Sequence, residues 1–184
     1  MVTKVWRLVA CLDGWGVVLL VAALGLTACG AGTPTLPPTP AGEGFAIYLT
    51  QPEITPAELA MLSHLELEAE PFLSINDIVA YSKADHLIEL TREGFEKVRN
   101  LNPRVWGRAF AVCVDGSPIY AGAFWPAYSS MSYDGVVIDP ILASPDLRVI
   151  AIQLGYPGEG FFRGEDPRGD PRVFEALQRA GKLQ

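Results

Sequence analysis

The chain has 184 residues and a net charge of −7, and 49% of its residues are hydrophobic while 19% are charged. This length fits one domain with short additional segments, and the apolar content excludes a chain that is disordered throughout. The acidic balance, with no stretch rich in lysine and arginine, argues against nucleic-acid binding, because phosphate groups would be repelled. We also expect no cofactor, since no cofactor-binding motif stands out.

The first 28 residues have the pattern of an export signal. Lys4 and Arg7 precede an uninterrupted apolar and glycine run over residues 15–26. This run has the length of a signal peptide, whereas a membrane-spanning helix needs about 20 apolar residues. Removal of residues 1–28 leaves 12 basic and 20 acidic residues, so the mature chain would have a net charge of −8.

The signal ends in Leu26-Thr27-Ala28-Cys29-Gly30, where small residues precede a cysteine. This motif resembles the lipobox of bacterial lipoproteins, which implies cleavage just before Cys29 and lipid attachment to its thiol. Two or three acyl chains, as the resemblance implies, suit stable anchoring, because one chain binds a membrane only reversibly. The expected location is the extracytoplasmic face of the cell membrane, or the outer membrane in a cell with two membranes. The alternatives are an ordinary cleaved signal and an uncleaved anchor.

A tether is predicted between the anchor and the domain. Residues 29–44 consist of Cys29 and a segment dominated by proline, glycine, alanine and threonine. Such a composition cannot bury a core and favours an extended, polyproline-like conformation. At ~3.1 Å per residue, the segment would reach on the order of 40–45 Å. The folded domain is therefore predicted over residues 45–184.

The domain begins with signals for a strand, a short helix and a second strand. Residues 45–50 form an apolar run bounded by glycine and proline, which predicts a strand. Thr55, Pro56 and Glu58 have the types and spacing of a capping box, which predicts a helix start. Residues 65–70 alternate between apolar residues and glutamates, which predicts a strand with one acidic face. The glutamates could hold a hard cation, although such a face more often is solvated or prevents edge pairing.

A hairpin is predicted next. Residues 74–77 indicate a helical turn capped by its serine, and residues 78–81 and 86–90 have the pattern of two strands joined by a polar loop. His64 and His86 are the two histidines of the chain. Neither has a further ligand at helical spacing, so we expect satisfied or exposed imidazoles and no catalytic histidine.

Two longer helices are predicted. The main helix covers residues 91–101, because Thr91 is a suitable N-cap and apolar residues recur along one side. Gly94 in its first turn allows close packing. A C-terminal helix is predicted over residues 171–180, since a proline follows an aspartate at its start. The preceding charged residues, 164–172, are expected to form a surface salt-bridge cluster rather than a calcium loop.

A central hairpin is predicted around Asp115-Gly116, a favoured pair for a two-residue turn. With this turn, Val112 would face Ile119, and Cys113 would be a buried, inert thiol rather than a reactive or metal-binding one. The main helix is expected to lie over the face of small residues. That face would consist of Ala109, Ala111, Cys113 and Tyr120.

The stretches IELTREGFEK at residues 88–97 and FAVCVDG at residues 110–116, followed by Ile119, give a strand, a helix, a strand, an Asp-Gly turn and a strand. In these features, residues 86–122 resemble the soluble head region of SecD-type protein-export subunits. The resemblance implies an α+β head fold and a role in contacting proteins. Because the chain shows no part with multiple membrane spans, we do not expect export activity.

The loop after this hairpin is rich in aromatic residues and serines. Its candidate binding residues are Phe124, Trp125, Tyr128, Tyr133 and Asp134. Aromatic rings with interleaved serines are typical of adaptable binding loops, and rings near a carboxylate suit a sugar or a peptide. The alternative is that Phe124 and Trp125 close the core while the serines form turns. No Gly-x-Ser-x-Gly motif is present, so we do not expect a serine nucleophile.

Taken together, the elements predict a single α+β domain with a mostly antiparallel sheet, completed by residues 136–138 and 147–154. We expect a non-catalytic module that binds an envelope protein, a peptide or a glycan. The alternative is a cell-envelope hydrolase acting on peptidoglycan or glycan. That activity would need a nucleophile–base pair, a metal site or a pair of carboxylates in a cleft. The sequence shows none of these, so no catalytic and no metal-binding residue is predicted.

Overall fold

The computed structural model of this chain describes residues 43–51, 53–59, 65–141 and 146–184. The predicted signal peptide over residues 1–28, the lipobox with Cys29 and almost all of the predicted tether lie outside the described residues, as does His64.

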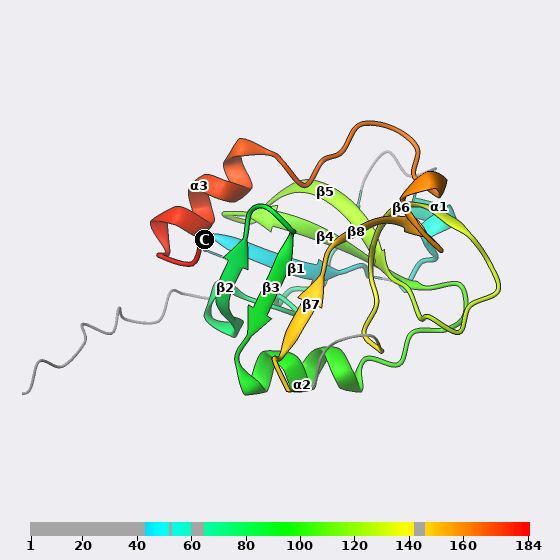
Figure 1. The fold of residues 1–184 in the computed structure, drawn as a ribbon, viewed down its shortest axis with the longest axis horizontal. Coiled ribbons are helices and arrows are strands. Elements are labelled where there is room, and N and C mark those ends of the chain that lie inside the picture. The colour runs from blue at the N-terminus through cyan, green and yellow to red at the C-terminus, as the bar shows by residue number, and fades with distance from the viewer. Residues whose placement is uncertain (1–42, 52, 60–64, 142–145) are drawn as a thin grey trace, which may run out of the picture. The chain divides into compact units, whose positions relative to one another are not determined.

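Eight strands in the described residues form two sheets (Figure 1). The larger sheet has the order β1-β4-β5-β6-β8 and consists of β1 (Phe45–Leu49), β4 (Arg108–Val114), β5 (Ser117–Phe124), β6 (Tyr133–Ile138) and β8 (Gln153–Tyr156). The smaller sheet has the order β2-β3-β7 and consists of β2 (Ile78–Ser82), β3 (Leu87–Leu90) and β7 (Val149–Ala151). Only β5 and β6 pair in parallel among these strands. The predicted α+β class with mostly antiparallel pairing is confirmed.

The helices are short. They are α1 (Pro56–Leu59), α2 (Arg92–Asn100) and α3 (Pro171–Arg179), with the 3₁₀ turns η1 (Ile75–Asp77) and η2 (Glu159–Phe161). The main and C-terminal helices were therefore predicted to within one residue at each end. No helix within the described ranges is both long and apolar enough to cross a membrane.

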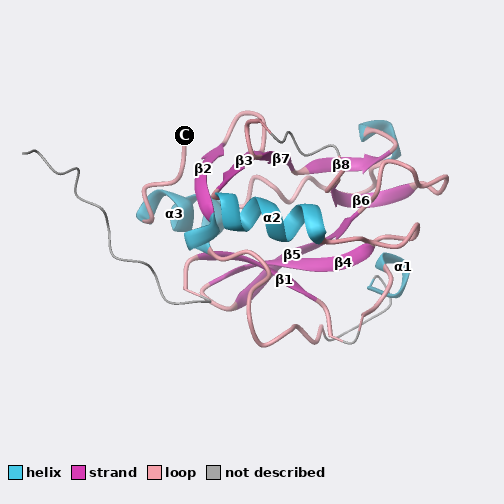
Figure 2. Cartoon of the chain, turned by 90° about the horizontal axis from the view of Figure 1, so that it is seen from below, coloured by secondary structure: helices cyan, strands magenta, loops and turns pink. Residues whose placement is uncertain are grey.

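The hydrophobic core lies between the two sheets and is closed by α2 and α3. Figure 2 shows α2 between the five-stranded sheet and the strands β2, β3 and β7. The buried members of this core include Phe45, Phe110 and Phe124 of the larger sheet, Tyr81, Ile88 and Leu90 of the smaller sheet, and Phe95, Val98, Val173 and Leu177 of the helices. Helix α2 thus covers one opening between the sheets, and its apolar residues join both of them.

The β4–β5 hairpin turns at Asp115-Gly116 as predicted. Its pairing register shifts between Cys113 and Val112, that is, beyond the second residue pair from the turn. A β-bulge between Val112 and Cys113 places Val112 opposite Tyr120. The prediction that Val112 faces Ile119 was therefore wrong, because the extra residue of a bulge shifts the rest of the ladder by one. As a result, Tyr120 lies in the main core and not on the small-residue face.

The small-residue face of β4 is covered differently from the prediction. Phe95 and Val98 of α2 pack into the main core, so the expectation that this helix covers the small residues was wrong. Leu65 and Leu67 pack there instead, against a buried group that contains Cys113. The bulky side chains of α2 need the wider space between the sheets, whereas an irregular segment fits over alanines. Burial of Cys113 is as predicted, and it raises the pKa of the thiol to about 11.

Residues 65–70 do not form the predicted strand. Only Leu67 makes a β-bridge, to Thr50, because β1 has already ended at that point. Glu68 does not join an acidic face but contacts Arg108, with 3.1 Å between the carboxylate and the guanidinium. Within the described part of the chain, no three potential ligands gather in a way that could hold a metal ion.

Residues 147–154 form two strands rather than one. β7 pairs with β3 of the smaller sheet, whereas β8 pairs with β6 of the larger sheet. The change occurs at Ile152, whose main-chain N–H donates to the carbonyl of His86. The chain therefore passes from the edge of the smaller sheet to the edge of the larger one within residues 149–156. The prediction of a single sheet was wrong because it treated this segment as one strand.

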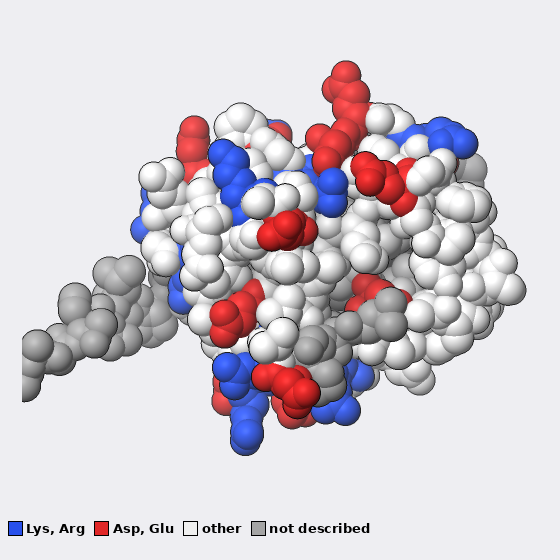
Figure 3. Space-filling view, in the orientation of Figure 1, with Lys and Arg blue, Asp and Glu red and all other residues white. Residues whose placement is uncertain are grey.

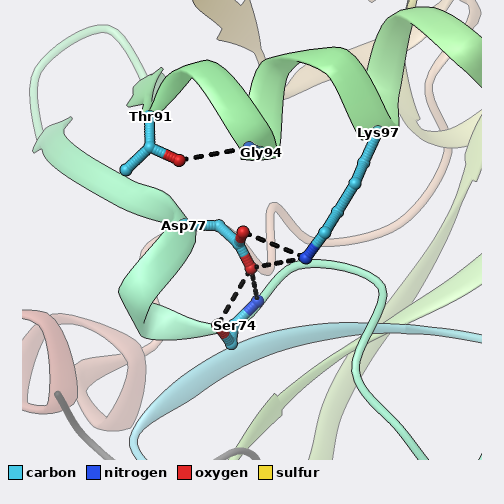
Figure 4. A network of polar contacts seen from close by, with 5 residues as sticks. All are labelled: Ser74, Asp77, Thr91, Gly94 and Lys97. Atoms are coloured by element: carbon cyan, nitrogen blue, oxygen red, sulfur yellow. Dashed lines mark hydrogen bonds and ion pairs between the residues drawn. The ribbon is translucent and has the colours of Figure 1, made fainter.

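Helix α2 is attached to η1 by a network of polar contacts (Figure 4). The Asp77 carboxylate accepts hydrogen bonds from the main-chain N–H of Ser74 at 2.8 Å and from the Lys97 ammonium at 3.0 Å. The Thr91 hydroxyl caps the helix by accepting from the Gly94 N–H at 3.1 Å. A Cβ atom at Gly94 would lie 2.9 Å from the Cβ of Asp77, so glycine permits this close approach.

Candidate functional site

Two of the predicted binding residues lie in the interior. Phe124 is fully buried and packs against Phe110, with 5.1 Å between the ring centres. Trp125 is 3% exposed and stacks on Tyr133, with ring centres 5.1 Å apart and an angle of 9° between the planes. Phe124 belongs to the main core, and Trp125 belongs to a second buried cluster with Ala123 and Val137. Both rings are packed inside, as the alternative interpretation of this loop expected, and neither is accessible to a partner.

The remainder of the loop is held in place by hydrogen bonds to a neighbouring loop. The Tyr128 hydroxyl donates to the carbonyl of Pro103 at 3.0 Å, and the Ser129 hydroxyl donates to the carbonyl of Val105 at 2.6 Å. From the other side, the Tyr156 hydroxyl donates to the Ser129 carbonyl at 3.2 Å. The loops over residues 101–107 and 125–132 therefore form one fixed structure.

These two hydrogen-bonded loops expose large apolar side chains to solvent. The exposed fractions are 44% for Val105, 38% for Trp106, 57% for Tyr128 and 49% for Met131. We call these four residues the loop patch. The guanidinium of Arg104 lies over the Trp106 ring, 5.4 Å from its centre. In Figure 3, the right-hand side of the molecule is mainly uncharged below the charged side chains at its upper edge. Several large apolar side chains exposed on two loops that are bonded to each other are typical of interaction sites.

A hollow of about 580 Å³, which we call the α1 hollow, has part of its lining in residues 132–134, which follow Met131 of the loop patch in the sequence. Its apolar walls are Pro56, Ala57 and Leu59 of α1, Ala121 of β5 and Phe161 of η2. Its polar groups come from Ser132, Tyr133 and Asp134. This volume lies within the range of small-ligand sites, and a mainly apolar wall with a few polar groups is their usual composition.

The polar side of the α1 hollow is acidic. Burial, together with the negative charge of Asp134, raises the pKa of Tyr133 to about 12, so its hydroxyl stays protonated. Arg163 is near but does not neutralise Asp134. Its main-chain N–H donates to the Asp134 carbonyl, while its guanidinium donates to the carbonyls of Gly160 and Phe162. The Asp134 carboxylate is therefore a negative charge without an ion pair among the described residues.

A second hollow, of about 440 Å³, runs along β8, and we call it the β8 hollow. Its lining includes Asp85, Asp139, Glu159 and Arg168. Arg168 is held by the carboxylate of Asp166 at 2.8 Å, as expected for the predicted salt-bridge cluster. This ion pair, which the sequence places two residues apart, fixes one wall of the β8 hollow.

His86 lies close to this wall but serves packing. Its Nδ1 is 3.0 Å from the hydroxyl of Tyr81, and its ring stacks on Phe174 of α3 at 6.5 Å. Burial and the positive charge of Arg168 lower the pKa of His86. The imidazole thus joins the β2–β3 hairpin to α3, in agreement with the expectation of a satisfied histidine.

The sequence analysis did not identify Val105, Trp106 and Met131 as site residues. The signal that was present is a Val-Trp pair in a turn that follows a helix-ending proline. A pair of that kind is normally buried, whereas here hydrogen bonds from Tyr128 and Ser129 help to hold the loop in a position in which both side chains are exposed.

Comparisons of the chain with known protein families, with curated proteins and with solved structures find no match. The lipobox at Cys29 and the resemblance of residues 86–122 to the head region of SecD-type subunits therefore stay predictions from the sequence.

Proposed function

We propose that this protein is a bacterial lipoprotein, anchored through lipid on Cys29, whose extracytoplasmic domain is a non-catalytic binding module of the cell envelope. The lipobox supports the anchor. One observation carries the binding role: hydrogen-bonded loops hold the four apolar side chains of the loop patch in solvent. Loops that are already ordered lose little conformational entropy on binding, so their exposed apolar area is available to stabilise a complex.

The direction of the strands supports this role. Gly44, where the predicted tether joins the domain, hydrogen-bonds to Asp115 at the turn of the β4–β5 hairpin. At the opposite end of β4, Arg108 pairs with Phe124, just before the loop that carries the patch. The seven residues of β4 separate these ends by roughly 20–25 Å, at about 3.4 Å per residue. The loop patch therefore lies at the end of the domain opposite its junction with the predicted tether.

The anchor is tested by Cys29→Ala. The wild-type protein should incorporate a labelled fatty acid and sediment with membranes, whereas the variant should lose both properties. A variant that still carries the label, or that stays with the membrane after a high-salt wash, would show that another segment holds the protein.

The binding role is tested with a photo-crosslinking amino acid at Met131 in intact cells. We expect a defined crosslinked product that disappears when Trp106→Ala is added, because this change removes the largest ring of the patch. A matched control has the crosslinker at Val79, which is 41% exposed on β2, away from the patch. The same product from both positions, or a product that does not depend on Trp106, would contradict recognition by the loop patch.

The alternative function is a hydrolase acting on peptidoglycan or glycan. One observation favours it, namely that three carboxylates, those of Asp85, Asp139 and Glu159, line the β8 hollow. Glycoside hydrolysis uses two carboxyl groups about 5–10 Å apart. The test is release of soluble fragments from purified peptidoglycan. The hydrolase requires release by the wild-type protein and loss of release in Asp85→Asn with Glu159→Gln, whereas the binding module predicts no release by either protein.

A further inference from the structure

The polar groups at this end of the domain fall into two sets. The hydroxyls of Tyr128, Ser129 and Tyr156 each donate to a main-chain carbonyl and fix the loops. By contrast, the side chains of Ser132 and Asp134 have no hydrogen-bond or ion-pair partner among the described residues, and the same holds for the hydroxyl of Tyr133. All three of these side chains line the α1 hollow. Their hydrogen-bonding capacity is available to a ligand.

We propose that the α1 hollow binds the cationic side chain of a lysine or arginine in an extended peptide segment of a partner protein, whose apolar side chains lie on the loop patch. This inference rests on the proposed binding function and specifies the chemistry of the partner. Because Met131 of the patch and Ser132 of the hollow are consecutive residues, one short segment can reach both.

Charge complementarity selects a cation. The carboxylate of Asp134 carries the only charge among the described residues that line the hollow. An ammonium or guanidinium group can donate to this carboxylate and to the oxygens of Ser132 and Tyr133, whereas a carboxylate or phosphate ligand would be repelled. The apolar walls formed by Leu59, Ala121 and other residues suit the methylene stem of a long basic side chain.

The loop patch selects a peptide over a sugar. Val105 and Met131 are aliphatic side chains that cannot satisfy the hydroxyl groups of a glycan, so a sugar placed on them would lose hydrogen bonds to water. Apolar side chains of a peptide bury the same surface without this cost. Tyr128 and Trp106 complete the surface with large, rigid contact area of the kind that carries binding energy in protein interfaces.

The experiment is an NMR titration of the ¹⁵N-labelled mature chain, kept soluble by Cys29→Ser. The probes are the peptide acetyl-Leu-Trp-Leu-Lys-Gly-amide, its counterpart with norleucine in place of lysine, and chitotriose. We expect the lysine peptide to shift the amide signals of Ser132, Asp134 and Phe161. It should bind roughly threefold to fivefold more tightly than the norleucine peptide, the effect of one partly exposed charge pair.

The variant Asp134→Asn has nearly the same shape, and its spectrum reports whether it is folded. It should remove the preference for the lysine peptide and leave the affinity of the norleucine peptide unchanged. The matched control is Glu96→Gln, which removes an exposed carboxylate of α2 far from the hollow and should keep the preference.

Three results would overturn the inference: no shifts around the hollow, equal affinities for the two peptides in the wild-type protein, or shifts caused by chitotriose alone. Each of these leaves the crosslinking from Met131 unaffected, so the peptide specificity can fail while the binding module stands. Loss of the Trp106-dependent crosslink would instead remove the proposed function itself.

Discussion

Asp77 is the residue on which the attachment of α2 depends most. Its carboxylate, which is 10% exposed, accepts from the N–H of Ser74 and from the ammonium of Lys97. Its main-chain carbonyl also accepts from the N–H of Thr91, the cap of the helix. One residue thus contacts the N-cap of η1, the N-cap of α2 and the last turn of α2, so it helps to fix the position of the helix.

The variant Asp77→Ala should lower the free energy of unfolding by about 1–2 kcal/mol, because it leaves the partly buried N–H of Ser74 and the ammonium of Lys97 without their acceptor. Urea denaturation followed by circular dichroism measures this change. The matched control is Asp85→Ala, in an exposed turn. Among the described residues its carboxylate accepts only from the hydroxyl of Ser82, so the effect should stay within about 0.5 kcal/mol. Equal losses in the two variants would show that the network contributes no more than a surface contact.

His86 should make the stability of the domain dependent on pH. Its pKa is lowered from the ordinary value of 6.5, first by burial and then by the positive charge of Arg168, against the opposing effects of Asp166 and Asp85. The folded state therefore binds the proton less well than the unfolded chain. The stabilisation is complete above the unfolded pKa of about 6.5 and is lost as the pH falls below that value towards the lower, folded pKa.

The corresponding measurement is the free energy of unfolding of the wild-type protein and of His86→Gln between about pH 7.5 and pH 5.5, the interval in which an unperturbed imidazole titrates. The wild-type protein should lose stability towards the acidic end, and the variant should show a flatter profile. Parallel profiles would assign the pH dependence to other groups.

At the scale of an element, Gly94 sets how closely α2 approaches η1. Gly94→Ala improves helix propensity by about 1 kcal/mol, but the added Cβ would lie 2.9 Å from the Cβ of Asp77. Overpacking of this kind costs about 1–3 kcal/mol, so we expect a net loss of stability despite the better helix former. Thermal unfolding gives the sign directly. Glu96→Ala, on the exposed side of α2, is the control and should leave the melting temperature nearly unchanged; a stabilised Gly94→Ala would show that the helix can move away without loss.

Local signals were sufficient to predict most of the elements. The capping box of α1 exists, since the Glu58 carboxylate accepts from the Thr55 N–H at 2.7 Å and the Thr55 hydroxyl accepts from the Glu58 N–H. The cap of α2 at Thr91 and the start of α3 at Pro171 were correct for the same reason. Each of these signals involves residues within a few positions of one another, so the sequence alone contains the whole interaction.

Contacts between distant segments could not be predicted in this way. The bulge beside Cys113 changes which side chain faces the core, and no residue at that place marks it. Residues 65–70 alternate as a strand does, but the single bridge of Leu67 depends on where β1 ends. The exposed position of Trp106 likewise depends on hydrogen bonds that the loop receives from residues more than 20 positions away. A sequence pattern indicates which conformation a segment prefers, whereas the segments that pair with it determine the conformation it adopts.

At the scale of the whole molecule, the larger sheet has the predicted tether junction at one end and the loop patch at the other. One end of β1 and β4 holds Gly44, where the predicted tether joins the domain, and the other end supports the loop patch. An exposed patch that contains tryptophan and tyrosine could also lie on the lipid surface to which the protein is proposed to be anchored, since these residues favour membrane interfaces. Two points oppose that position: the chain left after the proposed cleavage would have a net charge of −8, which anionic lipids repel, and the patch lies at the end of the domain opposite Gly44.

A patch that lies on the lipid surface and a patch that faces a peptide partner predict different quenching of a fluorescent label by lipids. A bimane label at Met131→Cys, on the lipidated protein in vesicles that contain brominated lipids, should not be quenched if the patch binds a peptide, because the patch lies at the end of the domain opposite Gly44. The label reports that site alone, since Cys113 is fully buried and its pKa is raised to about 11. In the proposed anchor the thiol of Cys29 carries the lipid, and Cys11 belongs to the signal peptide that cleavage removes. The same label at Val79→Cys, on the smaller sheet, is the control for non-specific contact. Quenching confined to the Met131 position would identify the loop patch as a membrane-binding surface and would remove the case for a peptide partner there.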